Sequence, residues 1–268
     1  MTDRQLTAAL AGSATVATTA PALRRSQAWR WVLHTARLDL YADPTAQLSR
    51  EETLITCGSA VHRARVALAA DGVDVRIELL PDDDPDHVAT LTPVGSIGVT
   101  EDARRLVEAA QRTRPASGED PAPPWTVGRP AEALTGVALA EAAQAEHTGL
   151  RALGRAEARR LADTVPLLAR PPRVDADRDE RTMFAVLYGE GEAPAAWLRA
   201  GQALSAVELT ATLAGLSLAA SASAVALARS RAVLRELLPE GNVPYLGLRI
   251  TPRITPAAGR RRLADRVA

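Results

Sequence analysis

Two helical stretches of equal length constrain the fold of this chain more than any other feature of its sequence. Segments 58–72 and 201–215 each run from glycine to glycine over 14 positions, with matching small or apolar residues between them. Apolar residues recur there at helical spacing, and glycine stands where a helix commonly ends. A strand-like segment precedes each helix, at 38–41 and at 182–188. We interpret this pattern as a duplicated unit.

The remaining periodicity predicts a mixture of strands and helices without regular βαβ alternation. This mixture favours an α+β layered fold over a doubly wound sheet. No G-x-G-x-x-G fingerprint opens a helix, so a Rossmann cofactor site has no support. The predicted helices are 4–20, 51–70, 101–112, 131–147, 155–168, 194–214 and 224–238, and the predicted strands are 29–33, 38–41, 73–79, 87–92, 182–188 and 245–250.

Composition excludes several classes of function. The 32 acidic residues balance 32 basic ones, all of them arginine, so no nucleic-acid partner is expected. A Schiff-base lysine and a Walker-type lysine are excluded because the chain has no lysine. Cys57 is the single cysteine, which excludes an intrachain disulfide, and a buried small hydrophobe is its simplest interpretation.

No membrane or secretory segment is expected, and we predict a cytoplasmic protein. The first residues lack the apolar core of a signal peptide. The uncharged stretch between Glu208 and Arg229 approaches the length of a spanning helix, but it contains Gly215 and five serine or threonine residues. A buried helix followed by a turn explains it better.

Several ordered segments carry motifs of a known protein family. Residues 20–31 read APALRRSQAWRW and resemble the A-P-S-x-x-N-x-Q-P-W segment of nitroreductase-like flavoproteins. They are most similar to the Acg-type actinobacterial branch, in which this segment reads H-N-[ST]-Q-P-W-R-W. Four further segments resemble motifs of that branch in the same order. Segment 56–60 resembles its S-C-G-A-A helix start, and segment 80–89 resembles its L-P-D…D-P-D-x-x-A loop. Segment 197–212 resembles its W-x-x-x-G-x-A-L…L-x-A-T helix, and segment 259–263 resembles its closing P-R-R-P.

The resemblance implies a fold, a cofactor and partners. It implies an α+β nitroreductase-like layered fold with two related halves, 1–100 and 101–268, fused as an intrachain pseudo-dimer in one compact unit. The cofactor would be FMN at one site per chain. NAD(P)H and a small-molecule acceptor would be the partners, and the chain would be a monomer or a homodimer.

The resemblance also assigns candidate cofactor-binding residues, although no catalytic side chain and no metal ligand. Arginine suits the flavin phosphate because its planar fork bonds it bidentately, and a donor or cation is needed near the N1 and O2 atoms of the ring. The ring residues would be Arg24, Arg25, Ser26 and Gln27, and the phosphate residues would be Arg112, Thr113 and Arg114, closed over by Arg260 and Arg261.

The chain also departs from the branch's pattern. Arg24 and Arg25 replace its His-Asn, Ala28 replaces its proline, and the R-x-[ST]-x-R-R motif is shortened to residues 112–115. Two main hypotheses follow: an FMN-dependent NAD(P)H oxidoreductase, or a degenerate non-catalytic member that sequesters flavin or has lost it and acts as a binding partner. A structural module of unrelated fold is the third.

Other chemistry-bearing residues have simpler interpretations. Asp82, Asp83, Asp84 and Asp86 form a Pro-flanked run that lacks calcium-loop geometry, so a solvated turn is expected. The four histidines, His34, His62, His87 and His147, have neither metal-ligand nor triad spacing. Trp29 and Trp31 would face one side of a strand and pack in a core or an interface.

Overall fold

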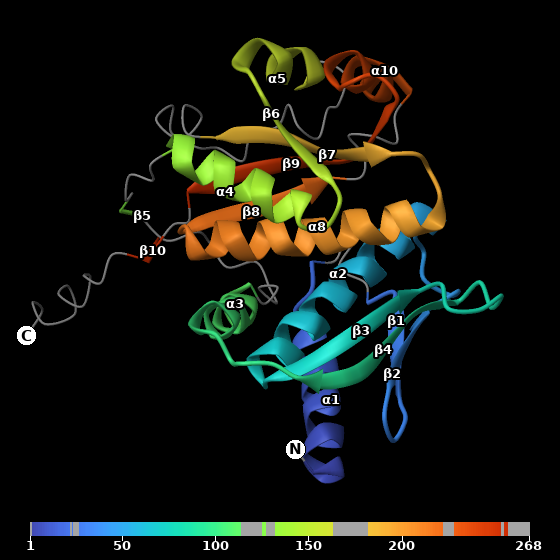
Figure 1. Cartoon of the computed structure of the whole chain (residues 1–268). Helices are drawn as coiled ribbons and strands as arrows, with labels where there is room; N and C mark the ends of the chain where they lie inside the picture. The colour runs from blue at the N-terminus through green and yellow to red at the C-terminus, as the bar shows by residue number, and fades with distance from the viewer. Residues whose placement is uncertain are drawn as a thin grey trace, which may run out of the picture.

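The described residues form two four-stranded antiparallel sheets with helices packed between and against them (Figure 1). This mixture agrees with the α+β class predicted from the sequence. Two further short strands, β5 (Trp125–Thr126) and β10 (Thr255–Pro256), pair with each other. The structure, a computed structural model, describes residues 2–21, 23, 27–113, 125–126, 132–162, 182–221, 228–252 and 255–256.

The first sheet has the strand order β1-β2-β4-β3. Its strands are β1 (Trp29–Leu33), β2 (Leu38–Ala42), β3 (Val73–Leu79) and β4 (His87–Ser96). Burial along β3 alternates residue by residue, because one face of the sheet lies on the core and the other is open to solvent.

Three helices accompany this sheet: α1 (Asp3–Ala17), α2 (Arg50–Ala70) and α3 (Glu101–Arg112). The helix α2 begins at a capping box, in which the Ser49 side chain accepts from the backbone of Glu52 and the Glu52 carboxylate accepts from the backbone of Ser49. It ends before Gly72, whose φ of 75° lies in the left-handed region that glycine adopts without strain.

The second sheet has the order β6-β7-β9-β8. Its strands are β6 (Gly149–Leu153), β7 (Met183–Glu190), β8 (Leu216–Ser221) and β9 (Asn242–Pro252). The helices are α4 (Glu132–Gln144), α5 (Arg155–Ala162), α8 (Pro194–Leu213) and α10 (Ala228–Leu237). Leaving α5 and α10 aside, both sheets arise from the same succession of helix, two strands, long helix and two strands.

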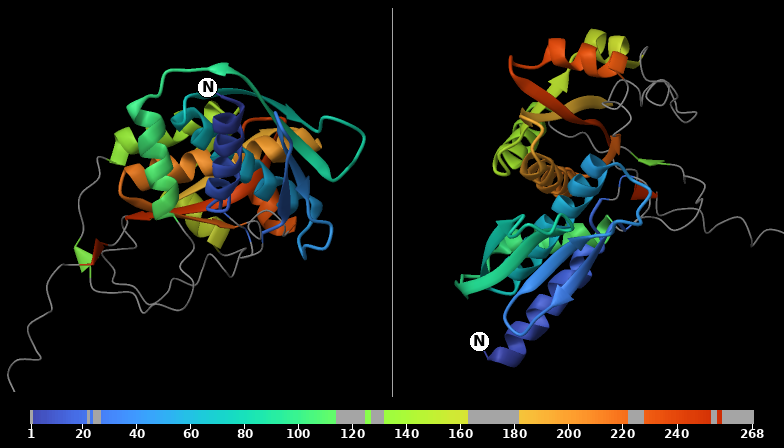
Figure 2. Two further views of the ribbon diagram at one scale, coloured as in Figure 1. Left: turned by 90° about the horizontal axis from the view of Figure 1, so that it is seen from below. Right: turned by 90° about the vertical axis from the view of Figure 1, so that its right-hand side faces the viewer.

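The long helices α2 and α8 lie side by side between the two sheets (Figures 1 and 2). Both are buried on nearly all sides. They approach so closely that a Cβ atom on Gly58 would lie 2.8 Å from the carbonyl carbon of Leu198, and one on Gly201 would lie 2.7 Å from that of Ile55. The Ser59 hydroxyl donates to the Gly201 carbonyl across the contact at 2.9 Å. The matched segments 58–72 and 201–215 of the sequence therefore lie for most of their length in these two adjacent helices.

The structure also corrects the predicted elements. Residues 149–153 and 216–221 form the strands β6 and β8, neither of which the sequence periodicity predicted. The predicted helix 131–147 therefore ends at Gln144, and the uncharged stretch after Glu208 contains a helix end and a strand. Among the described residues, no helix is long and apolar enough to cross a membrane.

Candidate functional site

Only three of the nine residues that the sequence assigns to a flavin site are described by the structure: Gln27, Arg112 and Thr113. They come from two places, the segment before β1 and the end of α3. The other six lie outside the described residues: Arg24, Arg25, Ser26, Arg114, Arg260 and Arg261.

The segment before β1 lies against the first half of α2. The side-chain amide of Gln27 is exposed and donates to the carbonyl of Trp29 at 3.3 Å. The next residue, Ala28, is buried, and its carbonyl lies 3.9 Å from the sulfur of Cys57 on α2. Burial raises the pKa of the Cys57 thiol to about 12, so this cysteine is no nucleophile at neutral pH. The interpretation of Cys57 as a buried small hydrophobe is confirmed.

The end of α3 contacts α2 further along, at Arg63. The Thr113 hydroxyl donates to the carbonyl of Ala110 at 2.9 Å and accepts from Nη2 of Arg63 at 3.2 Å. Arg112 is exposed and pairs with Glu108 at 3.2 Å. Thr113, which the family motifs assign to the flavin phosphate, thus lies beside the buried cation Arg63, which the motifs did not identify.

Arg63 is the largest fully buried side chain among the described residues. Nη2 of its guanidinium group pairs with Glu208 of α8. Its Nε and Nη1 atoms have no hydrogen-bond acceptor among the described residues. Burial lowers the pKa of Arg63, while the charge of Glu208 opposes that shift. Buried donors without acceptors are costly, so this position is suited to an additional anion or acceptor.

A second polar cluster joins α2, α8 and the end of α4. Nδ1 of His62 lies 2.9 Å from the hydroxyl of Ser205, and its Nε2 lies 3.7 Å from a carboxylate oxygen of Glu146, which also pairs with Arg65. Burial, reinforced by the neighbouring guanidinium groups, holds the pKa of His62 well below its ordinary value, so the ring is neutral at pH 7. Ser205 is fully buried, so the three groups link helices and have no access to a substrate.

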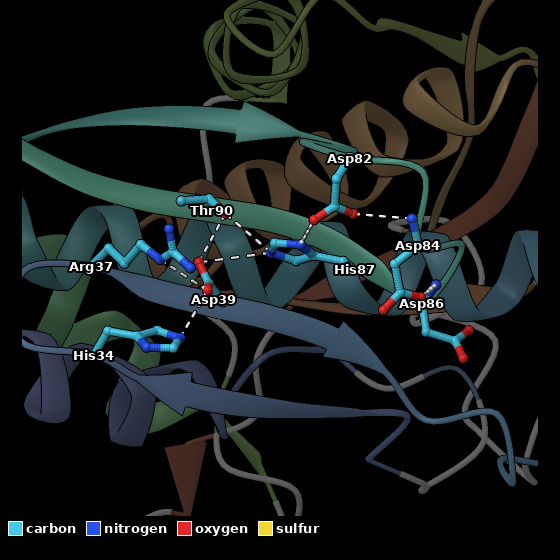
Figure 3. A network of polar contacts seen from close by, with 8 residues as sticks. All are labelled: His34, Arg37, Asp39, Asp82, Asp84, Asp86, His87 and Thr90. Atoms are coloured by element: carbon cyan, nitrogen blue, oxygen red, sulfur yellow. Dashed lines mark hydrogen bonds and ion pairs between the residues drawn. The ribbon is translucent and has the colours of Figure 1, made fainter.

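The outer part of the first sheet carries a third polar cluster, centred on the fully buried carboxylate of Asp39 (Figure 3). Asp39 pairs with Nε2 of His34 at 3.0 Å and with Nε of Arg37 at 3.1 Å, and it accepts a hydrogen bond from Thr90 at 2.8 Å. Nε2 of His87 lies 3.7 Å from the same carboxylate. Two histidines that are distant in the sequence thus converge on one aspartate, a contact that their spacing did not predict.

The aspartate-rich segment 82–86 forms a turn beside this cluster and contacts it through Asp82. Nδ1 of His87 bonds the carboxylate of Asp82 at 2.7 Å, and this contact lowers the pKa of Asp82 (Figure 3). Asp82 and Asp84 each accept from the backbone N–H two residues later, the pattern of Asx turns. No metal-ligating group of three or more side chains occurs among the described residues. The prediction of a solvated turn fits this geometry.

A cavity of about 700 Å³ opens where the end of α4 and the start of β6 meet the start of α8. Its volume lies within the usual range for small-molecule sites. None of the three described candidate flavin residues lines it. Its polar lining includes Arg199, His147 and the two tyrosines Tyr188 and Tyr245; the other lining residues are Ala140, Gln144, Thr148, Gly149, Leu150, Gly189, Glu190, Ala196 and Asn242.

Comparison with known proteins finds relatives but no matching family model. Two Mycobacterium tuberculosis proteins, acg and Rv3131, are similar in sequence. Both carry the name of a proposed NAD(P)H nitroreductase. The acg protein is 34% identical over 116 residues, which are 41% of this chain and 35% of that protein. Rv3131 is 35% identical over 83 residues, which are 29% of this chain and 24% of that protein.

This chain has nitroreductase relatives of the Acg type. The resemblance identified from the motifs is therefore confirmed, although the chain spans only about a third of the length of the acg relative it matches. Among solved structures, NfrA1 nitroreductase from B. subtilis overlays on 59% of this chain and 70% of its own, with 14% identity and a TM-score of 0.38. B. megaterium NfrA2 overlays with the same coverage and identity and a TM-score of 0.39. Both overlays are too distant to support an argument of their own.

Proposed function

We propose that this chain is an FMN-dependent NAD(P)H oxidoreductase of the nitroreductase type, built as an intrachain pseudo-dimer. The observation that carries the proposal is the Arg63–Thr113 corner. There, a buried guanidinium group, two of whose nitrogens find no acceptor in the described part of the chain, meets a residue that the motifs assign to the flavin phosphate. Similarity to proteins named as NAD(P)H nitroreductases supports the reaction class.

The pseudo-dimer is supported by reciprocal contacts between α2 and α8. Gly201 follows Gly58 by 143 residues, and Leu198 follows Ile55 by the same interval. Gly58 packs on the backbone of Leu198, and Gly201 packs on the backbone of Ile55. His62 and Ser205, also separated by 143 residues, contact each other directly. Such reciprocity is the signature of a twofold interface, in which residue i contacts residue j′ and residue j contacts residue i′.

The same observations support the proposed division into halves at residues 1–100 and 101–268. Each half contributes one sheet of equivalent strand order and one of the two central helices. Nitroreductase-type sites form between two such units, so a fused pair can complete a site within one chain. We propose one FMN per chain at the contact between the halves.

The described residues fit the two ends of a flavin. The segment before β1 contacts α2 at Cys57, and Thr113 contacts α2 at Arg63. These anchor points lie six residues apart, or about 9 Å along the helix axis. We propose that Gln27 and the residues before it hold the ring edge, while Thr113, Arg63 and the arginines around Thr113 hold the phosphate. Charge-assisted bonds from guanidinium groups make the phosphate end the stronger anchor.

When bound, FMN would supply hydride transfer from NAD(P)H and on to a small-molecule acceptor. The chain's own contribution is binding and orientation. Arg63 supplies a fixed positive charge from the core, and Thr113, whose hydroxyl accepts from Nη2 of Arg63 and donates to the carbonyl of Ala110, orients that guanidinium group. No side-chain acid or base is assigned, because hydride transfer needs none.

A second candidate function is a non-catalytic flavin holder or a flavin-free binding partner. The pair Arg24-Arg25 favours it, because two long cationic side chains stand where the related branch has His-Asn. An arginine there would either stabilise a reduced, anionic ring or occupy the place of the ring.

Anaerobic reduction separates the two functions. The purified protein is first loaded with FMN and then treated with NADPH while the absorbance of the flavin is followed. We expect the flavin to bleach and the colour to return when an acceptor such as a nitroaromatic compound or a quinone is added. Bound flavin that stays oxidised would leave only the holder function. A chain that binds no FMN would contradict both flavin-based functions and leave the flavin-free partner.

A further inference from the structure

None of the described residues proposed to hold flavin lines the cavity at the end of α4. It is bounded by the end of α4, the start of β6, the end of β7, the first turns of α8 and the start of β9, all in the second sheet's half (Figure 1). The α4–β6 corner holds the place in the second half that the α1–β1 corner, with Gln27, holds in the first. We propose that this cavity is a second ligand site, which takes a small aromatic carboxylate. The proposal does not rest on flavin binding.

The aromatic wall of the cavity is rigid because two tyrosine rings lie on glycines. A Cβ atom on Gly149 would come within 2.6 Å of the Tyr188 ring, and one on Gly189 within 2.8 Å of the Tyr245 ring. The Tyr245 hydroxyl donates to the carbonyls of Glu190 and Gly191, which fixes its ring. The ring of Trp197 meets Tyr245 edge-on, with centroids 4.9 Å apart.

Tyr188 provides the accessible aromatic surface. It is half-buried, whereas Tyr245 is 2% exposed. An aromatic ligand can therefore stack on Tyr188 without reordering the wall behind it. Offset aromatic stacking is favourable beyond the burial of area, which is why the ligand class is aromatic.

The charge in the cavity favours a monoanion. Arg199 is exposed in the lining, and no carboxylate of the described residues lies within ion-pair distance of it. It lies in the second turn of α8, which begins at Pro194 and also contributes Ala196 to the lining. Glu190 is the single carboxylate among the described lining residues. A lining with one cation, Arg199, and one anion, Glu190, suits a ligand with a single negative charge, such as a carboxylate, better than a dianionic phosphate.

His147 and Gln144 complete the polar side of the cavity. The φ angle of His147 is 55°, in the left-handed region, which turns the chain from α4 into β6. Neither side chain bonds another described residue, so both remain available to a ligand carboxylate. Histidine tolerates this backbone region better than most residues do.

The test is calorimetric titration of the full chain with benzoate, with benzamide as the neutral analogue of the same shape. We expect saturable binding of one benzoate per chain and about tenfold weaker binding of benzamide. Arg199→Gln should weaken benzoate binding about tenfold to hundredfold, because it removes a charge-assisted bond. Arg104→Gln is the matched control, since Arg104 is an exposed helical arginine that does not line the cavity. Its binding of benzoate should equal that of the parent.

Three results would overturn the proposal: no saturable benzoate binding, an unchanged affinity in Arg199→Gln, or an equal loss in Arg104→Gln. Titration of FMN in the presence of saturating benzoate keeps this proposal apart from the proposed function. Unchanged FMN affinity supports two separate sites, and competition would place flavin in this cavity and refute the assignment. If FMN does not bind at all, the flavin proposal fails while the benzoate titration still decides this one.

Discussion

Replacing Gly201 with alanine would force α2 and α8 apart at their closest approach. The new methyl group would lie 2.7 Å from the carbonyl carbon of Ile55 and 2.9 Å from the backbone nitrogen of Ser59, whereas ordinary van der Waals contact begins near 3.4 Å. Both neighbours are backbone atoms of a buried helix, so no side chain can move aside. The helices must separate by at least several tenths of an ångström.

The cost can be assembled from three contributions. Overpacking of a core costs about 1–3 kcal/mol, and the contact with rigid backbone points to about 3 kcal/mol. Separation also weakens the hydrogen bond from Ser59 to the Gly201 carbonyl, which contributes about 1 kcal/mol. The higher helix propensity of alanine returns about 1 kcal/mol. We therefore expect Gly201→Ala to lose about 3 kcal/mol of unfolding free energy.

Thermal unfolding followed by circular dichroism measures this loss. For a chain of this size, about 3 kcal/mol corresponds to a Tm lower by roughly 6–12 °C. Gly12→Ala is the matched control, because Gly12 lies in α1 and a Cβ there meets nothing within 4 Å. We expect the control to be as stable as the parent or up to about 1 kcal/mol more stable. Equal Tm values for the two variants would refute the packing described for α2 and α8.

Three further outcomes follow from the buried groups of α2. Arg63→Met combined with Glu208→Gln should weaken FMN binding about tenfold to hundredfold and leave riboflavin binding unchanged, because riboflavin lacks the phosphate; flavin fluorescence titration measures both affinities, and an equal loss for the two would refute the phosphate role. The pKa of His62 is depressed by folding, so its contribution to stability is present above its unfolded pKa of about 6.5 and is lost as the pH falls, by up to about 1.4 kcal/mol per pH unit. Urea unfolding of the parent and of His62→Gln at about pH 7 and pH 5.5 should show a smaller pH effect in the variant, and equal effects would contradict the neutral buried ring. Cys57 should resist iodoacetamide at about pH 8 in the native chain and react fully once unfolded, because burial raises its pKa to about 12; rapid native alkylation would show otherwise.

The sequence predicted correctly those helices and strands whose spacing of apolar residues is visible within the element itself. The alternation in β3 recurs in the structure because the strand presents one periodic face to the core, and α2 recurs as a helix buried on nearly all sides. The strand β8 was missed because Leu216–Ser221 is rich in small residues of low strand propensity. Its pairing with β9, from Leu216 against Pro252 to Ser221 against Gly247, makes it a strand. That partner is distant in the sequence.

At the candidate site, too, local motifs identified some residues and missed those whose contacts are distant in the sequence. The motifs pointed to Thr113, but they could not point to Arg63, whose partners Thr113 and Glu208 are 50 and 145 residues away. Nor could they reveal the cavity at His147, because the sequence pattern continued the helix past the left-handed turn that ends α4. Contacts between distant segments become visible only once α2 and α8 are placed side by side.

The central claim is that two fused halves hold one flavin in this chain. Its most direct measurement is the FMN stoichiometry of the full chain, by titration of the purified apoprotein with FMN and separation of bound from free flavin. We predict saturation at one FMN per chain, with release of authentic FMN on denaturation. Two FMN per chain would contradict the single fused site, and no saturable binding would contradict the flavoprotein assignment.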